Sequence, residues 1–275
     1  MTSAKAFAPA KINLTLHVTG QRPDGYHLLD SLVMFADIGD WITVRAAAKT
    51  QVTVDGPMAA GVPVDGRNLV VKAAGLIGVT AGIRLQKHLP AAAGIGGGSS
   101  DAAATLRALS DLSGNPIPAE TLSLGADVPV CMAACCSRMR GIGERITLVP
   151  DAPSLNVVLV NPRVDVSTPA VFQRLPDKIN PPMPDKLPRW RAASDFIQWL
   201  SEQRNDLESA ALSLAPEVGE TLAALRAQPG CELARMSGSG ATCFGVFPTL
   251  PAARAAALSL TRTQPKWWIK PSILT

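Results

Sequence analysis

Residues 90–101 read Pro-Ala-Ala-Ala-Gly-Ile-Gly-Gly-Gly-Ser-Ser-Asp, and this stretch decides the fold around it. Apolar residues alternate before it at Ile83 and Leu85, which predicts a strand. After it, apolar side chains recur at helical spacing over residues 102–112, which predicts a helix. Glycines let successive backbone N–H groups converge, and a helix start adds unpaired N–H groups and a partial positive charge. A glycine loop between a strand and a helix is therefore typical of a phosphate-binding site.

The loop differs from the two commonest phosphate-binding motifs. No lysine follows its last glycine, Gly98, so it is not a P-loop. Gly94 and Gly96 begin a dinucleotide-binding register, but the two further glycines disrupt it and no βαβ unit surrounds the loop. Ser99 and Ser100 offer hydroxyl groups to a phosphate or to Mg²⁺. The alternative interpretation is a flexible turn in which a serine caps the next helix.

The elements on either side of the loop are predicted from hydrophobic spacing and from capping residues. Apolar and polar residues alternate strictly over residues 11–18, which predicts a half-buried strand, and the turn-forming residues 20–25 end it. Asn68 can cap a helix, and Gly114 is a natural helix stop. The other predicted strands are residues 28–35, 41–44, 52–54, 83–85, 155–160, 231–236 and 242–247, and the predicted helices are residues 68–81, 100–113, 205–214, 216–227 and 251–262.

The order of these elements predicts an α+β fold in two domains. Strands and helices mix without the steady βα alternation of a doubly wound sheet. The composition shifts near Pro150 and Pro153, which suggests one domain over residues 1–150 and a second over residues 151–275. Residues 176–190 are rich in proline and are predicted to form a surface loop or linker.

The composition limits the class of protein. The chain has 275 residues, of which 47% are hydrophobic and 17% charged, as in a globular protein. Its net charge of +4 is too small to indicate a nucleic-acid partner. The five cysteines match no zinc or disulfide spacing, and we expect small buried thiols instead. We find neither a signal peptide nor a stretch apolar enough to span a membrane, so we expect a cytoplasmic protein with no membrane partner.

Two charged residues stand out as candidates for chemistry. Lys11 and Asn13 lie on the polar side of an apolar strand pattern, although a solvated strand face would explain them equally well. Asp127 is the only charged residue between Glu120 and Arg138, and an isolated acid in apolar surroundings is often functional. A helix-capping aspartate is the alternative. An aspartate and a lysine with phosphate-binding loops would suit phosphoryl transfer.

Two further segments could contact a ligand. Residues 237–241, Ser-Gly-Ser-Gly-Ala, form a second glycine loop between two predicted strands, which a tight turn would also explain. Tyr26 and His27 follow a turn, and an aromatic ring beside a hydrogen-bonding ring could hold a planar base. An ordinary turn aromatic is the alternative for this pair.

Five motifs occur together in the order of a known family. They are Pro9–Leu14, Gly25–His27, Pro90–Ala104, Gly125–Pro129 and Ser237–Ala241. Together they resemble the GHMP superfamily of small-molecule kinases, and within it the kinases that act on a cytidine-diphosphate-linked methylerythritol. The resemblance covers essentially the whole chain. It implies an N-terminal ribosomal-protein-S5-like domain, a C-terminal α/β sandwich and an active site in the cleft between them. It also implies ATP as phosphate donor, Mg²⁺, and phosphorylation of the 2-hydroxyl of the substrate.

The resemblance also assigns roles to residues. Asp127 matches the general base, and Lys11 matches the lysine that stabilises charge on the substrate oxygen. The matches to substrate-binding positions are Asn13, Tyr26, His27, Thr168 and Phe172, where the aromatic rings would hold the cytosine. The matches to the ATP side are Asn68, Lys87, Pro90, Gly94, Gly96, Gly97, Gly98, Ser99 and Ser100. The third motif, which closes the site, matches Gly238, Ser239 and Gly240.

Two departures and two alternatives accompany this resemblance. Residues 114–124 form a shorter connection than the family pattern suggests, and residues 133–138 lack the expected glycine turn. One alternative is a related kinase that acts on homoserine, mevalonate or a similar alcohol. Those substrates carry no base, so such a kinase would not need the rings of Tyr26, His27 and Phe172. A nucleotide-binding regulator that has lost activity is the other alternative, which the presence of both Lys11 and Asp127 disfavours. The residues do not predict an oligomeric state.

Overall fold

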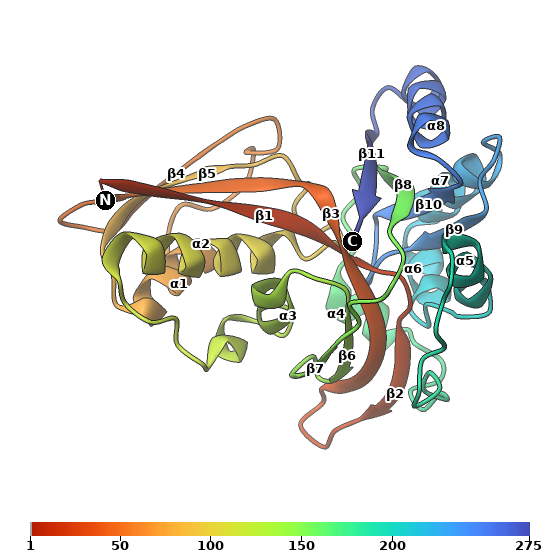
Figure 1. The fold of residues 1–275 in the computed structure, drawn as a ribbon, viewed down its shortest axis with the longest axis horizontal. Coiled ribbons are helices and arrows are strands. Elements are labelled where there is room, and N and C mark those ends of the chain that lie inside the picture. The colour runs from red at the N-terminus through yellow and green to blue at the C-terminus, as the bar shows by residue number, and fades with distance from the viewer. Residues whose placement is uncertain (1) are drawn as a thin grey trace. The chain divides into compact units, whose positions relative to one another are not determined.

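Strand β3 (His27–Ala46) runs through both of the units into which the chain divides. The computed structural model describes residues 2–275 (Figure 1). Unit 1 comprises the residues up to Lys11, Ile38–Ala91 and Gly96–Ala134; unit 2 comprises Ile12–Asp37, Ala92–Ile95 and Cys135–Thr275. The units are interleaved along the chain, whereas the boundary predicted near residue 150 follows chain order. That boundary stays a prediction.

The sequence predicts two strands where the structure has β3 alone. The two predicted strands cover residues 28–35 and 41–44, and the segment that contains Gly39 lies between them. A Cβ atom on Gly39 would lie 2.2 Å from the carbonyl oxygen of Ala8, which belongs to β1 (Ser3–Asn13). Glycine therefore allows a close backbone approach between paired strands here, and β3 continues for 20 residues.

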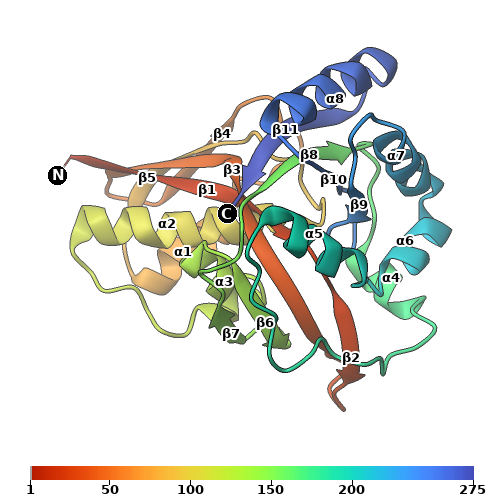
Figure 2. The ribbon, with the colours of Figure 1, turned by 45° about the vertical axis from the view of Figure 1, so that its right-hand side comes forward.

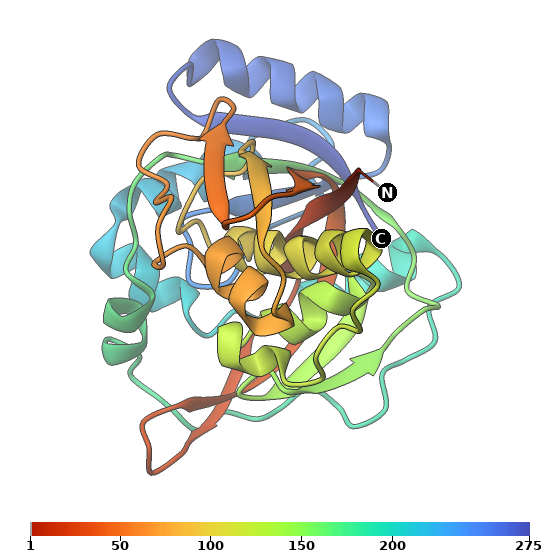
Figure 3. The same ribbon diagram turned by 90° about the vertical axis from the view of Figure 1, so that its left-hand side faces the viewer.

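Unit 1 is a sheet with helices on one face (Figure 3). Residues Trp41–Ala46 of β3 pair antiparallel with β5 (Ala81–Gln86), and β4 (Gln51–Asp55) pairs parallel with β5. Helices α1 (Leu69–Ile77) and α2 (Gly97–Ser113) pack against each other. The short elements η1 (Thr121–Leu124) and α3 (Val128–Ala133) complete the unit.

The helix ends of unit 1 follow from capping. The Asn68 side chain accepts a hydrogen bond from the Val70 N–H at 2.9 Å, so the predicted start of α1 is confirmed. Gly78 ends this helix in a left-handed conformation, three residues before the predicted end. The predicted stop of α2 at Gly114 is confirmed. Its start at Gly97 lies three residues before Ser100, so the helix begins inside the glycine run.

Unit 2 contains a second set of strands covered by helices (Figure 2). Strand β8 (Leu155–Asn161) lies between β11 (Trp268–Leu274) and β10 (Cys243–Phe247), and β9 (Leu233–Met236) pairs with β10. Helix α7 (Pro216–Arg226) packs on β9 and β10, and α8 (Leu250–Thr263) packs on β8 and β11. The remaining helices are α4 (Thr168–Gln173), α5 (Ala193–Ser201) and α6 (Glu208–Leu214).

The hairpin of β2 and β3, with β6 beside it, positions Tyr26 and His27 in unit 2. Strand β2 (His17–Gln21) pairs antiparallel with the start of β3, and residues 22–26 form the turn that the sequence predicts. Strand β6 (Ser137–Gly141) pairs with the other edge of β3 and with β7 (Arg145–Leu148). His27 therefore begins a strand that has a neighbour on both sides.

Several local predictions are wrong for identifiable reasons. Residues 11–18 are not one half-buried strand, because all eight are buried and β1 ends at Asn13, before β2 begins. Strand β11 escapes prediction because it contains Pro271, which is tolerated where β11 pairs with β8 alone. Ala134 takes the left-handed conformation, with φ of 47°, in the segment where a glycine turn is expected. The short helices α3, α4 and α5, the turn η1 and the strands β6 and β7 are also absent from the predictions.

Three findings concern the chain as a whole. All five cysteines are free thiols. The part of the chain that the structure describes, residues 2–275, holds no helix of the length and apolarity that crossing a bilayer requires. The Pro-rich residues 176–190 contain no helix or strand, which confirms the predicted loop.

Candidate active site

Lys11 and Asp127 form an ion pair in unit 1, although 116 positions separate them. The Lys11 Nζ atom lies 2.8 Å from the Asp127 Oδ2 atom. The Lys11 side chain is 5% exposed, whereas the Asp127 side chain is 33% exposed. Asp127 stands at the N-cap position of α3, yet its side chain makes no capping hydrogen bond. The carboxylate is thus paired with the ammonium and still accessible to a ligand.

Gly96 brings the glycine run against this ion pair. A Cβ atom on Gly96 would lie 3.1 Å from both the Cβ and the Cε atoms of Lys11, and 3.9 Å from Asp127 Oδ2. Its φ of 62° lies in the left-handed region that favours glycine. Both observations explain why glycine is needed at the residue that precedes α2.

The first turn of α2 provides an anion-binding geometry beside the pair. Gly97 and Gly98 form its first two positions, and Ser99 and Ser100 follow. The N–H groups of a first helical turn have no partner within the helix, and the helix dipole favours negative charge there. The Ser100 Oγ atom is buried without a hydrogen-bond partner among residues 2–275. These groups are suited to phosphate oxygens.

A buried charge cluster surrounds Lys87 in unit 1. The Lys87 Nζ atom lies 2.5 Å from Asp40 Oδ2 and 2.7 Å from Asp101 Oδ2, and all three residues are buried. Asp40 Oδ1 also accepts hydrogen bonds from the backbone N–H groups of His88 and Leu89. A Cβ atom on Gly97 would lie 3.3 Å from Lys87 Nζ, so the ammonium borders the first turn of α2.

Burial sets the protonation of this cluster. Burial raises the pKa of Asp101 to about 7, against the opposing effect of Lys87, and the nearby Asp40 raises it further. Burial alone would lower the pKa of Lys87, but the carboxylates of Asp101 and Asp40 outweigh it and raise that pKa. Asp101 Oδ1 has no hydrogen-bond partner among the described residues. The folded protein therefore favours a proton on Asp101 and a charge on Lys87.

This pKa predicts how stability depends on pH. Because the pKa of Asp101 is raised from 3.8 to about 7, the folded state holds a proton that the unfolded state loses at lower pH. Wild-type stability should fall as the pH rises between these two values, by at most about 1.4 kcal/mol per pH unit, and level off above them. Asp101→Asn should lack this fall. Urea unfolding of both proteins from pH 4 to 9 measures the difference, with the exposed Asp111→Asn as control. Parallel curves for wild type and Asp101→Asn would contradict the assignment.

The other predicted ATP-side residues have structural partners. The Asn68 side chain caps α1 and donates a hydrogen bond to the Pro63 carbonyl oxygen at 2.7 Å. Pro90 is buried in the connection that leads from β5 into the glycine run. Their contact with a nucleotide stays a prediction.

In unit 2, Gly94 packs against the third motif. A Cβ atom on Gly94 would lie 2.4 Å from the Ser237 carbonyl oxygen and 2.8 Å from the Gly240 nitrogen. The Ser237 hydroxyl donates to the Gly94 carbonyl oxygen at 2.9 Å. A Cβ atom on Gly238 would lie 2.7 Å from that same oxygen. The two glycine loops predicted from the sequence thus touch each other.

Asn13 and Asn205 tie further segments of unit 2 to this motif. The Asn13 backbone N–H donates to the Ser237 hydroxyl at 3.0 Å, and the Asn13 side chain donates to the Ser31 hydroxyl at 2.8 Å. The Asn205 side chain donates to the carbonyl oxygens of Met236 and Gly238, both at 2.8 Å. Asn13 is 4% exposed, so its side chain belongs to a preformed network.

The predicted base-binding rings are brought together in part. The rings of His27 and Phe172 stack, with centroids 4.5 Å apart and planes inclined by 22°. This spacing leaves no room for a base between them, so a base would stack on an outer face or part the rings. Burial lowers the pKa of His27, with a further effect of Lys178. Tyr26 is 59% exposed at the hairpin turn.

Thr168 begins α4 and contacts the third motif. Its hydroxyl lies 2.7 Å from the Ser239 hydroxyl, and either oxygen can donate. Phe172 is on the same short helix, which the Ser167 side chain caps. Helix α4 therefore carries both Thr168 and Phe172, and Thr168 joins this helix to the third motif within unit 2.

Sequence reasoning missed the residues that support the predicted ones. Asp40 and Asp101 hold Lys87, and Ser31 and Asn205 hold Asn13 and the third motif. Asp101 carries a signal, because it is a charged residue on the apolar side of a helix pattern. Asp40, Ser31 and Asn205 show none, because their partners lie far away in the sequence.

Two family descriptions match this chain. "GHMP kinases N terminal domain" matches residues 68–135, and "GHMP kinases C terminal" matches residues 186–266. The first contains the glycine run and Asp127, and the second contains the third motif. The predicted α+β fold with two GHMP kinase domains is confirmed by these matches.

Individual proteins match over nearly the full length. The 4-diphosphocytidyl-2-C-methyl-D-erythritol kinase of Dinoroseobacter shibae is 57% identical over 269 residues, which cover 98% of this chain and 94% of the relative. That of a Cereibacter sphaeroides strain is 56% identical over 272 residues, which cover 98% of each. A crystal structure of 4-(cytidine 5'-diphospho)-2C-methyl-D-erythritol kinase has 32% identity and a TM-score of 0.77 over 98% of both chains. A homoserine kinase structure from Cytophaga hutchinsonii, at 17% identity and a TM-score of 0.66, covers all of this chain and 95% of its own, and shares the fold.

Proposed function

This chain belongs to the GHMP kinases, and within them to the 4-diphosphocytidyl-2-C-methyl-D-erythritol kinases; from this premise we propose its reaction and the residues that perform it. The protein transfers the γ-phosphate of ATP to the 2-hydroxyl of 4-diphosphocytidyl-2-C-methyl-D-erythritol. This step belongs to non-mevalonate isoprenoid precursor biosynthesis. Asp127 is the general base, and Lys11 stabilises charge on the acceptor oxygen.

The observation that carries this proposal is the Lys11–Asp127 ion pair of 2.8 Å beside Gly96. A carboxylate is a weak base for an alcohol, but it can accept the proton late in a loose phosphoryl-transfer transition state. The ammonium of Lys11 lies 2.8 Å from the carboxylate and favours negative charge on the acceptor oxygen. The partial exposure of Asp127 leaves the carboxylate accessible to that hydroxyl.

The first turn of α2 and Lys87 hold the phosphate groups of ATP. The unpaired N–H groups of Gly97, Gly98 and Ser99 donate to phosphate oxygens, and the helix dipole adds a favourable field. The ammonium of Lys87 borders this turn and remains charged because its contacts with Asp101 and Asp40 raise its pKa. Positioning and neutralisation of charge are the main tasks of the protein in this chemistry.

Mg²⁺ fits the same place through oxygen ligands. The unpartnered hydroxyl of Ser100 and the hydroxyl of Ser99 are the hard donors that this ion prefers. The described part of the chain holds no group of three His, Cys, Asp or Glu residues able to bind a metal. The ion would therefore arrive with the phosphates, and it supplies neutralisation of their charge.

Unit 2 supplies recognition of the cytidine. His27 and Phe172 offer stacked rings, and the exposed ring of Tyr26 is close in sequence to His27. The neutral imidazole of His27 can hydrogen-bond to the edge of a base, since burial lowers its pKa. Homoserine and mevalonate offer no base for these rings.

A coupled ADP-release assay tests the reaction. The protein is incubated with ATP, Mg²⁺ and the cytidine-linked methylerythritol, and in parallel with homoserine and with mevalonate. We expect turnover with the first acceptor alone. Turnover with another acceptor would assign the chain to a different alcohol, and no turnover with any would favour a regulator that binds nucleotide.

Two substitutions test the base-binding residues. Tyr26→Ala and His27→Ala should raise the KM for the cytidine-linked substrate by about tenfold or more, because each removes a stacking or hydrogen-bonding ring worth about 1–3 kcal/mol. The KM for ATP should stay within about twofold, since the proposal assigns the phosphate groups to other residues, the first turn of α2 and Lys87. Leu258→Ala, at an exposed apolar residue of α8, is the control. An unchanged KM for the cytidine substrate would remove the two residues from the base site.

A further inference from the structure

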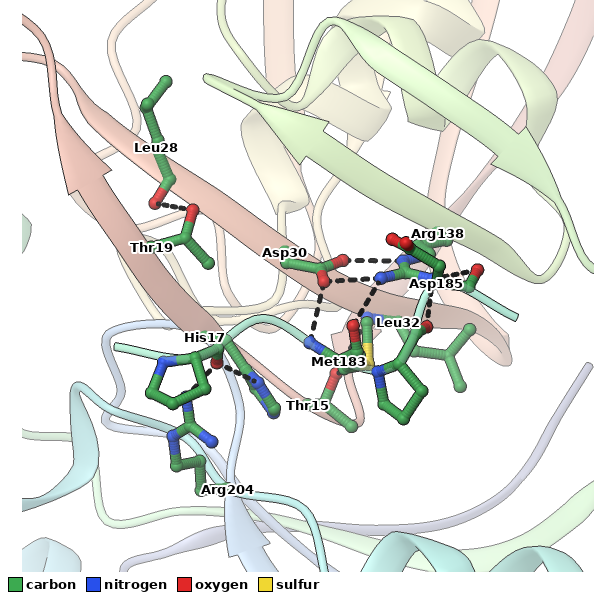
Figure 4. A network of polar contacts seen from close by, with 12 residues as sticks. Thr15, His17, Thr19, Leu28, Asp30, Leu32, Arg138, Met183, Asp185 and Arg204 are labelled. Atoms are coloured by element: carbon green, nitrogen blue, oxygen red, sulfur yellow. Dashed lines mark hydrogen bonds and ion pairs between the residues drawn. The ribbon is translucent and has the colours of Figure 1, made fainter. Parts of the chain in front are cut away.

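The Pro-rich segment of unit 2 is fixed to the hairpin that carries His27. Residues 177–190, which we call the strap, connect the end of α4 to the start of α5 and contain no helix or strand. A segment with so little regular structure is ordinarily mobile. Here a row of side-chain and backbone hydrogen bonds holds it along β2 and β3 (Figure 4).

The first half of the strap lies along β2. The Asn180 backbone N–H donates to the Val18 carbonyl oxygen at 3.0 Å. The Pro181 carbonyl oxygen lies 3.2 Å from His17 Nδ1 and also accepts from Arg204 Nη2. This half of the strap covers an edge of β2 that would otherwise expose unpaired backbone groups.

Asp30 and Arg138 clamp the second half. Asp30 lies opposite His17 on β3, and its two carboxylate oxygens accept from Arg138 Nε at 2.7 Å and Nη2 at 2.6 Å. The same carboxylate accepts from the Met183 backbone N–H at 2.9 Å, so Asp30 bonds to both Arg138 and the strap (Figure 4). Both charged side chains are almost completely buried.

The Arg138 guanidinium holds three consecutive carbonyl groups of the strap. Its Nη2 atom donates to the Met183 oxygen at 3.1 Å, and its Nη1 atom donates to the oxygens of Pro184 at 2.8 Å and Asp185 at 3.0 Å. Together with the two bonds to Asp30, all five N–H donors of the side chain are used. No other side chain presents five donors in this planar arrangement.

The clamp also contacts the network that holds Asn13. The Thr15 hydroxyl donates to the Met183 sulfur at 3.2 Å and accepts from the Leu32 backbone N–H. The Ser31 hydroxyl, next to Asp30 on β3, bonds to the Thr15 carbonyl oxygen and accepts from the Asn13 side chain. A polar network therefore runs from a proposed substrate residue to the strap.

The strap connects the two elements that supply the base-binding rings. His27 begins β3, on the hairpin that the strap is bonded to. Phe172 lies near the end of α4, and only seven residues separate it from Asn180, whose backbone N–H donates to the Val18 carbonyl oxygen of β2. A fixed strap limits how far α4 and the hairpin can move apart, and so limits the separation of the two rings.

We propose that Asp30 and Arg138 are positioning residues that fix the strap, and through it the Phe172 and His27 rings, for a nucleotide base. Neither residue touches the base itself. The proposal rests on the proposed function, because the cytidine of the substrate is the base concerned. It adds to that function a buried ion pair that affects the affinity for the cytidine-linked substrate and leaves the affinity for ATP unchanged.

Arg138→Lys tests the clamp with the least change in volume and charge. A lysine can pair with Asp30 but cannot hold three carbonyl groups as well. We expect the KM for the cytidine-linked substrate to rise about tenfold, the size of effect that a small misplacement of a binding group produces, and the KM for ATP to stay unchanged. Trypsin should also cleave faster after Lys178 and Lys186, which are exposed strap residues whose cleavage requires local opening.

Two further variants complete the test. Arg140→Lys is the matched control, because Arg140 lies on the same strand and its buried Nε atom has no hydrogen-bond partner among residues 2–275. Asp30→Leu with Arg138→Leu replaces the buried pair by apolar groups, which commonly preserves a fold, and should release the strap in the same way. Thermal unfolding of each variant checks that the protein remains folded.

The outcomes separate the clamp from the reaction. Faster cleavage together with a raised KM for the cytidine substrate supports the proposal. Faster cleavage with an unchanged KM would show that the strap does not position the rings, and unchanged cleavage would show that the pair does not hold the strap; either overturns it. Absence of turnover by the wild type would overturn the proposed function and the predicted KM effect, while the protease result would still decide the role of the clamp.

Discussion

Replacing Asp127 with asparagine is expected to lower kcat by about 10²- to 10⁴-fold, the range that a positioned acid or base contributes. Asparagine keeps the size of the side chain but cannot accept the proton of the acceptor hydroxyl. Lys11 would remain beside the site without the carboxylate that it pairs with at 2.8 Å. The KM for ATP should stay within a few-fold, because the first turn of α2 and Lys87 hold the phosphates in our proposal.

Single-turnover kinetics with saturating ATP measures this effect on the transfer step itself. Titration with ATP analogues confirms that the variant is folded and binds nucleotide. Asp111→Asn, at an exposed aspartate of α2 in the same unit, serves as the matched control and should keep wild-type kcat. A transfer rate within tenfold of wild type for Asp127→Asn would exclude this residue as the base. In that case, Lys11→Met tests whether charge stabilisation contributes more to the transfer rate than proton removal does. If it does, removing the Lys11 charge should still lower the rate.

The sequence predicted those parts of the fold in which local pattern and tertiary structure agree. The cap at Asn68, the stop at Gly114 and the strand at Leu155 all appear as expected, because each depends on neighbouring residues. Gly39 shows the opposite case. It lies between two predicted strands, but its lack of a side chain allows a close contact with Ala8 on another strand. Single-sequence reasoning has no access to such a contact.

The candidate site also contains some features that the sequence predicts and others that only the folded chain reveals. Residue types and motif order indicate Lys11, Asp127 and the glycine run, and the structure brings the first two within 2.8 Å. Their catalytic roles stay predictions. The stacking of His27 on Phe172 is not predictable from the sequence, because the two residues lie far apart along the chain. The Asp30–Arg138 pair joins residues 108 positions apart, so only the folded chain relates them.

The interleaved units also lie beyond sequence reasoning. A change in composition near Pro150 suggests a boundary in chain order, yet the compact units exchange segments at Lys11, Ile38 and Gly96. Strand β3 causes part of this exchange, because its 20 residues contribute to both units.

Replacing Lys87 with methionine is expected to lower the free energy of unfolding by about 3–5 kcal/mol, the cost of removing one partner from a buried ion pair. The variant leaves the carboxylates of Asp40 and Asp101 buried close to each other, with no cation between them. Protonation of Asp101 relieves part of this repulsion, because its pKa is already raised to about 7. The loss should therefore be larger at pH 9 than at pH 6.

Urea unfolding at both pH values measures the loss, with Lys49→Met at an exposed position as the matched control. Adding Asp101→Asn to Lys87→Met removes one of the two buried charges and should restore a large part of the lost stability. Adding Asp40→Asn to Lys87→Met should restore less stability, because the Asp40 Oδ1 atom also accepts hydrogen bonds from the backbone N–H groups of His88 and Leu89. Equal rescue by Asp40→Asn and Asp101→Asn would show that the charge of the cluster alone matters. Unequal rescue would show that Asp40 also fixes the chain just ahead of the glycine run, and so ties the stability of the cluster to the geometry of the proposed phosphate site.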